Sequence, residues 1–180
     1  MSGIERGQAN GRLGRLWQTW RFHLAAAAIA VPVAAFPGFY ADQLRFSGVS
    51  GLGAREAGSF AVGPFDLTLA EFTADAPLDG GVAGDRKQFI LRLCAWCDAR
   101  IRAVYARIGK PRSLRAAGAL FSGSPGRMFV DIPIPPGASV EDALWLTVEE
   151  WDGAVHMGAV PLESASPATA AWLRKKETTG

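Results

Sequence analysis

One uncharged segment near the N-terminus constrains the fold of this chain more than any other feature of its sequence. It is the 19-residue run Phe22–Tyr40, FHLAAAAIAVPVAAFPGFY, which carries no formal charge when His23 is neutral. About 20 predominantly apolar residues are enough for an α-helix to cross the hydrocarbon core of a bilayer. The run therefore predicts a transmembrane anchor over residues 22–40.

The residues on either side of this run predict its orientation. The 21 residues before it carry four arginines against one glutamate, a net charge of +3, and Trp17 and Trp20 lie close to its start. Phe36, Phe39 and Tyr40 close its far side. Basic residues favour the cytoplasmic side of a membrane, and aromatic residues collect at both interfaces. We therefore expect residues 1–21 in the cytoplasm, a single span of a bacterial inner membrane, and the remaining chain in the periplasm.

Two other interpretations of the run stay open. A cleaved signal peptide, with small residues such as Val33 and Ala35 at the cleavage site, would also export the rest of the chain. A buried core helix would not, and the flanking arginines and aromatic residues disfavour it. Export matters for the two cysteines of the chain, because disulfides persist in an oxidising envelope.

The composition is that of an ordinary globular protein with an apolar bias. The 180 residues are 49% hydrophobic and 20% charged, with a formal net charge of +2, which argues against a nucleic-acid partner. The Gly- and Ser-rich segment 41–59 predicts a flexible tether. We expect a periplasmic domain over residues 60–165 and a tail over 166–180 that begins with a short helix.

Beyond Ser59 the sequence alternates between short apolar runs and turn residues. Alternation of apolar and polar side chains is typical of strands with one buried face. Seven such runs in about 100 residues predict a mainly β domain, an immunoglobulin-like β-sandwich. The seven candidate strands are Phe60–Phe72, Gln88–Cys94, Arg100–Ile108, Ala119–Phe121, Met128–Ile134, Leu144–Trp151 and Ala154–Leu162.

The third of these candidates also fits a helix. Its apolar residues Ile101, Val104, Tyr105 and Ile108 have the i, i+3, i+4, i+7 spacing of one helical face. A helix over residues 98–108, stopped by the following Gly109, is therefore the alternative, and it would make the domain α+β.

The dipeptide Asp152-Gly153 between the last two candidate strands is a strong hairpin signal. If these two residues form the turn, Glu149 pairs with His156. In that register one face of the hairpin holds Leu144, Leu146, Val148, Met157 and Ala159, and the other holds Trp145, Thr147, Glu149, His156 and Val160.

The only two cysteines, Cys94 and Cys97, lie in the stretch LRLCAWCDARIRAVY. A disulfide requires Cα atoms within about 7 Å. Residues three apart on a straight strand lie about 10 Å apart. A bridge therefore requires the chain to turn at Ala95-Trp96, where it would act as a local staple at the end of a strand.

A metal site is the second interpretation of the cysteines. Two thiolates are half of a tetrahedral site. The candidates that could complete it are His156 and Met157, or Met128. Sulfur and imidazole ligands together would take copper or zinc. For His156 the simpler alternative is a surface partner of Glu149.

Redox catalysis is the third interpretation. The strand QFILRL, the motif CAWC and a helix from Asp98 together resemble the thioredoxin family, and the final hairpin and ASPATAAWLRKK add to the likeness. The resemblance implies a first cysteine at a helix N-terminus, where its pKa is lowered. The chain departs from the family because no proline directly precedes LWLTV and because Trp96 lies between the cysteines.

The segment from Arg86 to Arg127 carries ten basic residues against Asp98 alone. Either neighbouring acidic strands neutralise it, or the loop Gly109–Arg115 forms a basic rim for anionic headgroups, an anionic ligand or an acidic partner. The residues predicted to bind an anion or a partner are Lys110, Arg112, Arg115 and Arg127. Three tryptophans that either dock a partner or pack within the domain are Trp96, Trp145 and Trp151.

The sequence predicts no catalytic residues. One histidine beyond the anchor is too few for a Ser/His/Asp site to be credible, and nucleotide-binding motifs are missing. We expect a membrane-anchored accessory or assembly module with an envelope protein partner. One span followed by such a domain is similar in architecture to accessory proteins of cytochrome oxidase assembly, which implies metal-centre maturation or metal uptake. The alternatives are a tethered thiol–disulfide oxidoreductase and a structural envelope protein.

Overall fold

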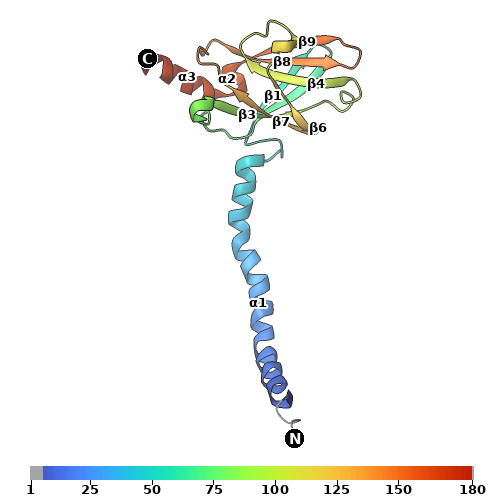
Figure 1. The fold of residues 1–180 in the computed structure, drawn as a ribbon, viewed down its shortest axis with the longest axis vertical. Helices are drawn as coiled ribbons and strands as arrows, with labels where there is room; N and C mark the ends of the chain where they lie inside the picture. The colour runs from blue at the N-terminus through green and yellow to red at the C-terminus, as the bar shows by residue number, and fades with distance from the viewer. Residues whose placement is uncertain (1–5, 180) are drawn as a thin grey trace. The chain divides into compact units, whose positions relative to one another are not determined.

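A long helix forms the N-terminal part of the chain. The computed structural model describes residues 6–179, which divide into two compact units between Asp42 and Gln43. The helix α1 covers Arg6–Ser47 (Figure 1), and Pro32 and Pro37 lie within it. Its segment Trp17–Leu44, 28 residues, is long and apolar enough to cross a membrane, and its apolar stretch is not buried. The buried-helix hypothesis is therefore wrong, and the expected anchor lies inside this segment.

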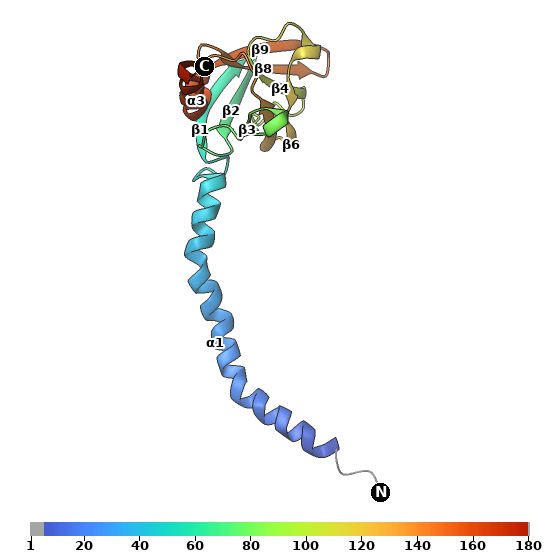
Figure 2. The ribbon, with the colours of Figure 1, turned by 60° about the vertical axis from the view of Figure 1, so that its left-hand side comes forward.

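Two antiparallel sheets follow, which confirms the prediction of a mainly β domain (Figures 1 and 2). The first sheet has the strand order β1-β2-β3-β7-β6 and the second β5-β4-β8-β9. The strands of the first sheet are β1 (Arg55–Val62), β2 (Phe65–Glu71), β3 (Arg86–Arg92), β7 (Arg127–Pro133) and β6 (Ser122–Ser124). Those of the second are β5 (Ala119–Leu120), β4 (Ile101–Ile108), β8 (Ala143–Glu150) and β9 (Val155–Pro161). Two 3₁₀ turns, η1 (Gly81–Ala83) and η2 (Leu114–Ala116), lie in the loops.

The inner faces of the two sheets share one hydrophobic core. Leu67 and Leu69 of the first sheet and Val104, Leu146 and Val148 of the second are fully buried in the same cluster. Each comes from an alternate position of its strand, as period-two packing requires. Burying a side chain of this kind contributes about 1.5–3 kcal/mol, so this cluster is the main source of stability.

The helix expected as the alternative over residues 98–108 is absent, because β4 occupies Ile101–Ile108. Pairing of β4 with β8 shifts between Ile101 and Ala103, which marks a β-bulge. A bulge inserts one extra residue, so Ile101 and Val104 both point into the core although they are three positions apart. The bulge therefore produced the helix-like spacing, and Tyr105 lies on the outer face with Ala103.

The β8–β9 hairpin forms as expected, but its predicted register is wrong by one residue. Glu149 pairs with Val155 and Val148 with His156. The loop holds three residues, closed by a hydrogen bond from the Glu150 amide to the Ala154 carbonyl (2.9 Å), and Gly153 has φ +90°. Three-residue loops of this kind contain a glycine bulge. The shift buries Val160 and leaves Met157 40% exposed.

The run Phe60–Phe72, predicted as one strand, is a hairpin of β1 and β2 that turns at Gly63-Pro64. The part of β1 that lies before Phe60 contains Gly58 at a register shift, with φ +121°. Glycine and polar residues at an edge strand hide the alternating pattern, and the same holds for β6, whose sequence is SGS. The alternating pattern therefore predicted neither β6 nor the part of β1 that lies before Phe60.

The expected flexible tether over residues 41–59 is also not observed. The last turn of α1 extends to Ser47, Gly48 ends the helix with φ +63°, and β1 begins at Arg55. The connection is closely packed, because the Gly53 amide donates to the Ser47 carbonyl (3.0 Å) and Leu52 is fully buried.

The C-terminal segment, expected as a tail that begins with a short helix, packs against the domain over most of its length. It forms α2 (Leu162–Ala165) and α3 (Pro167–Thr179), and Ala170 and Leu173 are buried. Ser166 precedes the proline and accepts a hydrogen bond at Oγ from the Thr169 amide (3.2 Å), as an N-cap residue does.

A buried ion-pair network joins this segment to the first sheet. Glu71 of β2 and Lys87 of β3 are 1% and 2% exposed, and Lys87 Nζ lies 2.9 Å from Glu71 Oε1. Arg55 of β1 also pairs with Glu71 and donates to the Ala165 carbonyl (2.6 Å), while the Ser166 hydroxyl donates to Glu71. Lys87 Nζ further donates to the carbonyls of Thr73 (2.8 Å) and Asp75 (2.6 Å).

Removing one charge of this network is expected to destabilise the domain strongly. Glu71→Gln leaves Lys87 buried without its carboxylate, and breaking a buried ion pair costs about 3–5 kcal/mol. Guanidinium unfolding of the full chain in detergent, followed by tryptophan fluorescence, measures the loss. The matched control is Glu163→Gln, which breaks an exposed pair with Arg174 and should cost below about 1 kcal/mol. Equal losses would contradict a structural role for the network.

The hairpin turn gives a second prediction. Gly153→Ala places a side chain at φ +90° and should lower the free energy of unfolding by roughly 1–2 kcal/mol. Gly137→Ala, in an open loop without positive φ, should have no comparable effect in the same titration.

Candidate functional site: the disulfide turn and its ion pairs

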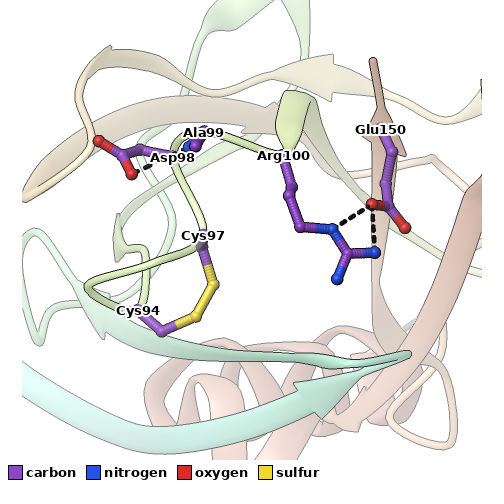
Figure 3. Close-up of a disulfide and its surroundings, with 6 residues drawn as sticks. All are labelled: Cys94, Cys97, Asp98, Ala99, Arg100 and Glu150. Atoms are coloured by element: carbon purple, nitrogen blue, oxygen red, sulfur yellow. Dashed lines mark hydrogen bonds and ion pairs between the residues drawn. A yellow bond between two sulfur atoms is a disulfide. The ribbon is translucent and has the colours of Figure 1, made fainter. Parts of the chain in front are cut away.

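The site begins with a tight turn at the end of β3. Cys94 and Cys97 form a disulfide with Cα atoms 5.1 Å apart, and the Cys97 amide donates to the Cys94 carbonyl (3.0 Å) (Figure 3). The chain therefore reverses at Ala95-Trp96, where the sequence required a turn for a bridge. Cys97 is fully buried in the core, and Cys94 is partly buried against it.

The residues after the bridge continue the turn and then enter β4. The Cys97 carbonyl accepts hydrogen bonds from the amides of Arg100 (3.0 Å) and Ile101 (2.9 Å). Because a strand begins at Ile101, neither cysteine lies at the start of the helix on which the thioredoxin resemblance depends. The α+β alternative is therefore wrong.

The disulfide turn holds Trp96 against the start of β2. The Trp96 ring lies 5.6 Å from the ring of Phe65 and is 52% exposed, whereas Phe65 is fully buried. The Arg100 guanidinium lies over both rings, 5.1 Å from Phe65 and 5.9 Å from Trp96. Cation–π contacts of this kind stabilise the exposed tryptophan in one position.

A buried carboxylate orients that arginine. Glu150, at the end of β8, is 4% exposed and accepts from Arg100 Nε (2.9 Å) and Nη2 (2.7 Å) (Figure 3). Its other oxygen lies 2.7 Å from His156 Nε2. The His156 ring packs edge-on against Phe65, and a side chain at Gly63 would collide with it. Residues from β2, β8, β9 and the turn before β4 thus meet at one end of the two sheets.

A second aromatic–cation pair lies beside this cluster. Trp151 in the hairpin loop is 68% exposed, and the Arg102 guanidinium lies 5.9 Å from its ring. Arg102 also pairs with Glu149 (3.0 Å), which accepts from the Tyr105 hydroxyl (3.3 Å). Burial raises the pKa of Tyr105 above its ordinary value, and the Glu149 carboxylate raises it further.

Residues 16–163 match the model of a family described as "Uncharacterised conserved protein UCP029505". The chain belongs to this family. The match covers the apolar segment Trp17–Leu44 and every strand of both sheets, so the family unit includes this helix as well as the domain. No curated protein and no solved structure matches the chain.

The structure of this UCP029505 chain does not assemble the predicted metal site. The two sulfurs form a disulfide. His156 is hydrogen-bonded to Glu150, whereas the sequence suggested Glu149 as its partner. Among residues 6–179, no group of three or more His, Cys, Asp or Glu residues is arranged to hold a metal ion. Met157 is 40% exposed on the other face of the β8–β9 hairpin from His156.

The predicted basic residues fall into two separate places. Lys110, Arg112 and Arg115 are exposed in the loop after β4, and Lys110 Nζ lies 5.4 Å from the Trp145 ring. A cavity of about 350 Å³ beside this loop is lined by residues that include Ile108 and Pro133, at the ends of β4 and β7. Arg127 is at the other end of β7, six residues before Pro133, which corresponds to about 20 Å along the strand. It therefore does not share a rim with the others.

Sequence reasoning missed Phe65, Arg100 and Glu150 as members of the site. Phe65 has the pattern of an ordinary core residue, and Glu150 lies in a run of acidic residues that looks exposed. No local pattern in the sequence marks them. The bulge at Ile101, seen only in the structure, lies beside Arg100, whose carbonyl accepts a hydrogen bond from the Trp151 amide (3.1 Å).

The bridge gives a third prediction. Alkylation and mass spectrometry of the full chain should detect no free thiols before reduction. The double variant Cys94→Ala/Cys97→Ala should lose roughly 2 kcal/mol of unfolding free energy, because the loop it opens is short. Cys94→Ser/Cys97→Ser should lose more, since it also places a hydroxyl at the buried position of Cys97. Two free thiols in the untreated protein would contradict the bridge.

Proposed function

We propose that the chain is a single-pass inner-membrane protein that presents a β-sandwich in the periplasm and binds another envelope protein. The apolar helix supports the anchor, and the basic residues before it support a cytoplasmic N-terminus. The disulfide supports an oxidising compartment, because bonded cysteines are rare in reducing ones.

The proposed domain type is immunoglobulin-like. Such domains have the strands A, B, E and D in one sheet and C, F and G in the other, with C′ added beside C in variable-type domains. The order β2-β3-β7-β6 follows A-B-E-D, and β5-β4-β8-β9 follows C′-C-F-G. On this correspondence β1 is an additional edge strand, and the disulfide turn and the β8–β9 loop are the B–C and F–G loops.

The observation that carries the binding function is the disulfide turn that holds Trp96 half-exposed over Phe65 and Arg100. Trp151 is a second exposed tryptophan, and its amide donates to the carbonyl of Arg100 (3.1 Å). Tryptophan and arginine dominate the binding energy of protein interfaces. A side chain fixed before binding loses less entropy on association. Trp96, which the disulfide turn holds in place, is therefore suited to dock a protein.

The two remaining hypotheses have less support. Metal-centre maturation would require the bridge to open and His156 to leave Glu150 before any ligand set could form. An oxidoreductase would lack the helix that lowers the pKa of the first cysteine in the thioredoxin arrangement. We therefore propose partner binding without assigning a metal.

Site-specific photo-crosslinking in cells tests the surface. Benzoylphenylalanine at position 96 is expected to give a discrete heavier adduct, and the same residue at position 159, exposed on the outer face of the second sheet, is not. The background Cys94→Ala/Cys97→Ala should lower the adduct yield several-fold, because the turn is no longer pinned. Adducts of equal yield at both positions, or unchanged yield without the bridge, would contradict the proposed surface.

A further inference from the structure

An aromatic cluster lies on the outer face of the first sheet, separate from the core. Phe46, in the last turn of α1, has its ring 5.8 Å from that of Phe72, and Phe72 lies 5.6 Å from Phe129. Phe46 is 41% exposed and Phe129 36% exposed. Val49, in the turn after the helix, is 97% exposed. The cluster therefore presents apolar surface at the point where the chain enters the domain.

The sheet register explains why this apolar surface stays exposed. Ala70, Ile90 and Phe129 lie side by side on β2, β3 and β7. Leu52, Ala70 and Ile90 bury one another in a small cluster of their own, against which Phe72 packs. Ser122 of β6, the next partner in this row, is exposed and polar. Ala70 and Ile90 are therefore covered, whereas the neighbouring Phe129 is not.

The short connection limits how far this cluster can lie from the bilayer proposed for the anchor. Phe46 is six residues beyond Tyr40, the end of the uncharged run, or about 9 Å at 1.5 Å per helical residue. The headgroup layer on each side of the hydrocarbon core is about 5–8 Å thick. Hydrogen bonds from Gly48 to Leu44 (2.9 Å) and from Gly53 to Ser47 (3.0 Å) close the connection tightly. If residues 22–40 cross the bilayer as proposed above, this spacing puts Phe46, and with it Phe72, near the outer boundary of the headgroups.

The charges around the cluster suit that position. Arg92 and Arg127 alternate with Ile90 and Phe129 on the outer face, and within residues 6–179 neither makes an ion pair. Arg86 on the same face pairs with Asp131 (3.5 Å). The carboxylates Glu56 and Asp66 belong to β1 and β2, so the half of the face formed by β3 and β7 is the basic one. Guanidinium groups bind phosphate through paired hydrogen bonds.

We propose that the outer face of the first sheet docks on the headgroup layer of the bilayer that the chain crosses, with Phe72 and Phe129 as aromatic anchors and Arg92 and Arg127 as phosphate ligands. Phenylalanine is among the apolar residues that membrane-surface helices bury at the boundary between headgroups and acyl chains. The docking fixes the domain against the membrane without a second protein and is independent of the partner surface at Trp96.

The test uses the full chain in nanodiscs of phosphatidylethanolamine and phosphatidylglycerol that contain a gadolinium-chelating headgroup lipid. A trifluoromethyl label is attached at Ser122→Cys, beside Phe129, or at Ala159→Cys, on the outer face of the second sheet. The native cysteines are bonded to each other, so each label is unique. We expect several-fold stronger paramagnetic broadening of the fluorine signal at position 122 than at 159. Equal broadening, or stronger broadening at 159, would overturn the proposal.

Matched substitutions extend the test. Phe129→Ser should reduce the broadening at position 122 at least twofold, whereas Leu120→Ser, which removes an exposed leucine from β5, should leave it unchanged. An unchanged signal after Phe129→Ser combined with Arg127→Ser would also overturn the proposal. The chemical shift of the label at position 159 shows that each variant remains folded.

Discussion

The buried ion pair between Glu71 and Lys87 is the interaction on which the arrangement of this domain depends. Neither charge reaches water, so each needs the other, and the carbonyls of Thr73 and Asp75 complete the lysine's shell. Through Arg55 and Ser166 the same carboxylate holds β1 and the start of α3. The first sheet, the chain entering it and the C-terminal helix are thus tied at one point.

The opposite end of the sheets carries the candidate function. Here the hydrophobic core ends at Cys97 and Phe65, and the disulfide replaces packing as the constraint on the chain. It holds Trp96 against Phe65, while Glu150 orients Arg100 over both rings. The ion-pair network therefore lies at one end of the sheets, and the disulfide turn with Trp96 lies at the other.

The sequence was informative where burial follows a simple period. Alternation located β2, β3, β4, β7, β8 and β9, and the uncharged run located the apolar helix. It failed where one residue breaks the period: the bulge at Ile101 imitated a helix, and the bulge at Gly153 shifted the hairpin register. Lys87 and Glu71 look like surface residues, because only the fold brings them together in the core. The cysteine turn was predictable from bond geometry, whereas the contacts of Trp96 with Phe65 and Arg100 join residues from three segments and have no local signature.

We propose above that the helix near the N-terminus anchors the two-sheet domain on the far side of the inner membrane, where the Cys94–Cys97 disulfide forms. A reporter fused behind Gly180 tests this location directly. Alkaline phosphatase, which folds only outside the cytoplasm, should be active, and a fluorescent reporter that folds only inside should stay dark. A bright fluorescent fusion with inactive phosphatase would contradict both the location and the partner proposed for this domain.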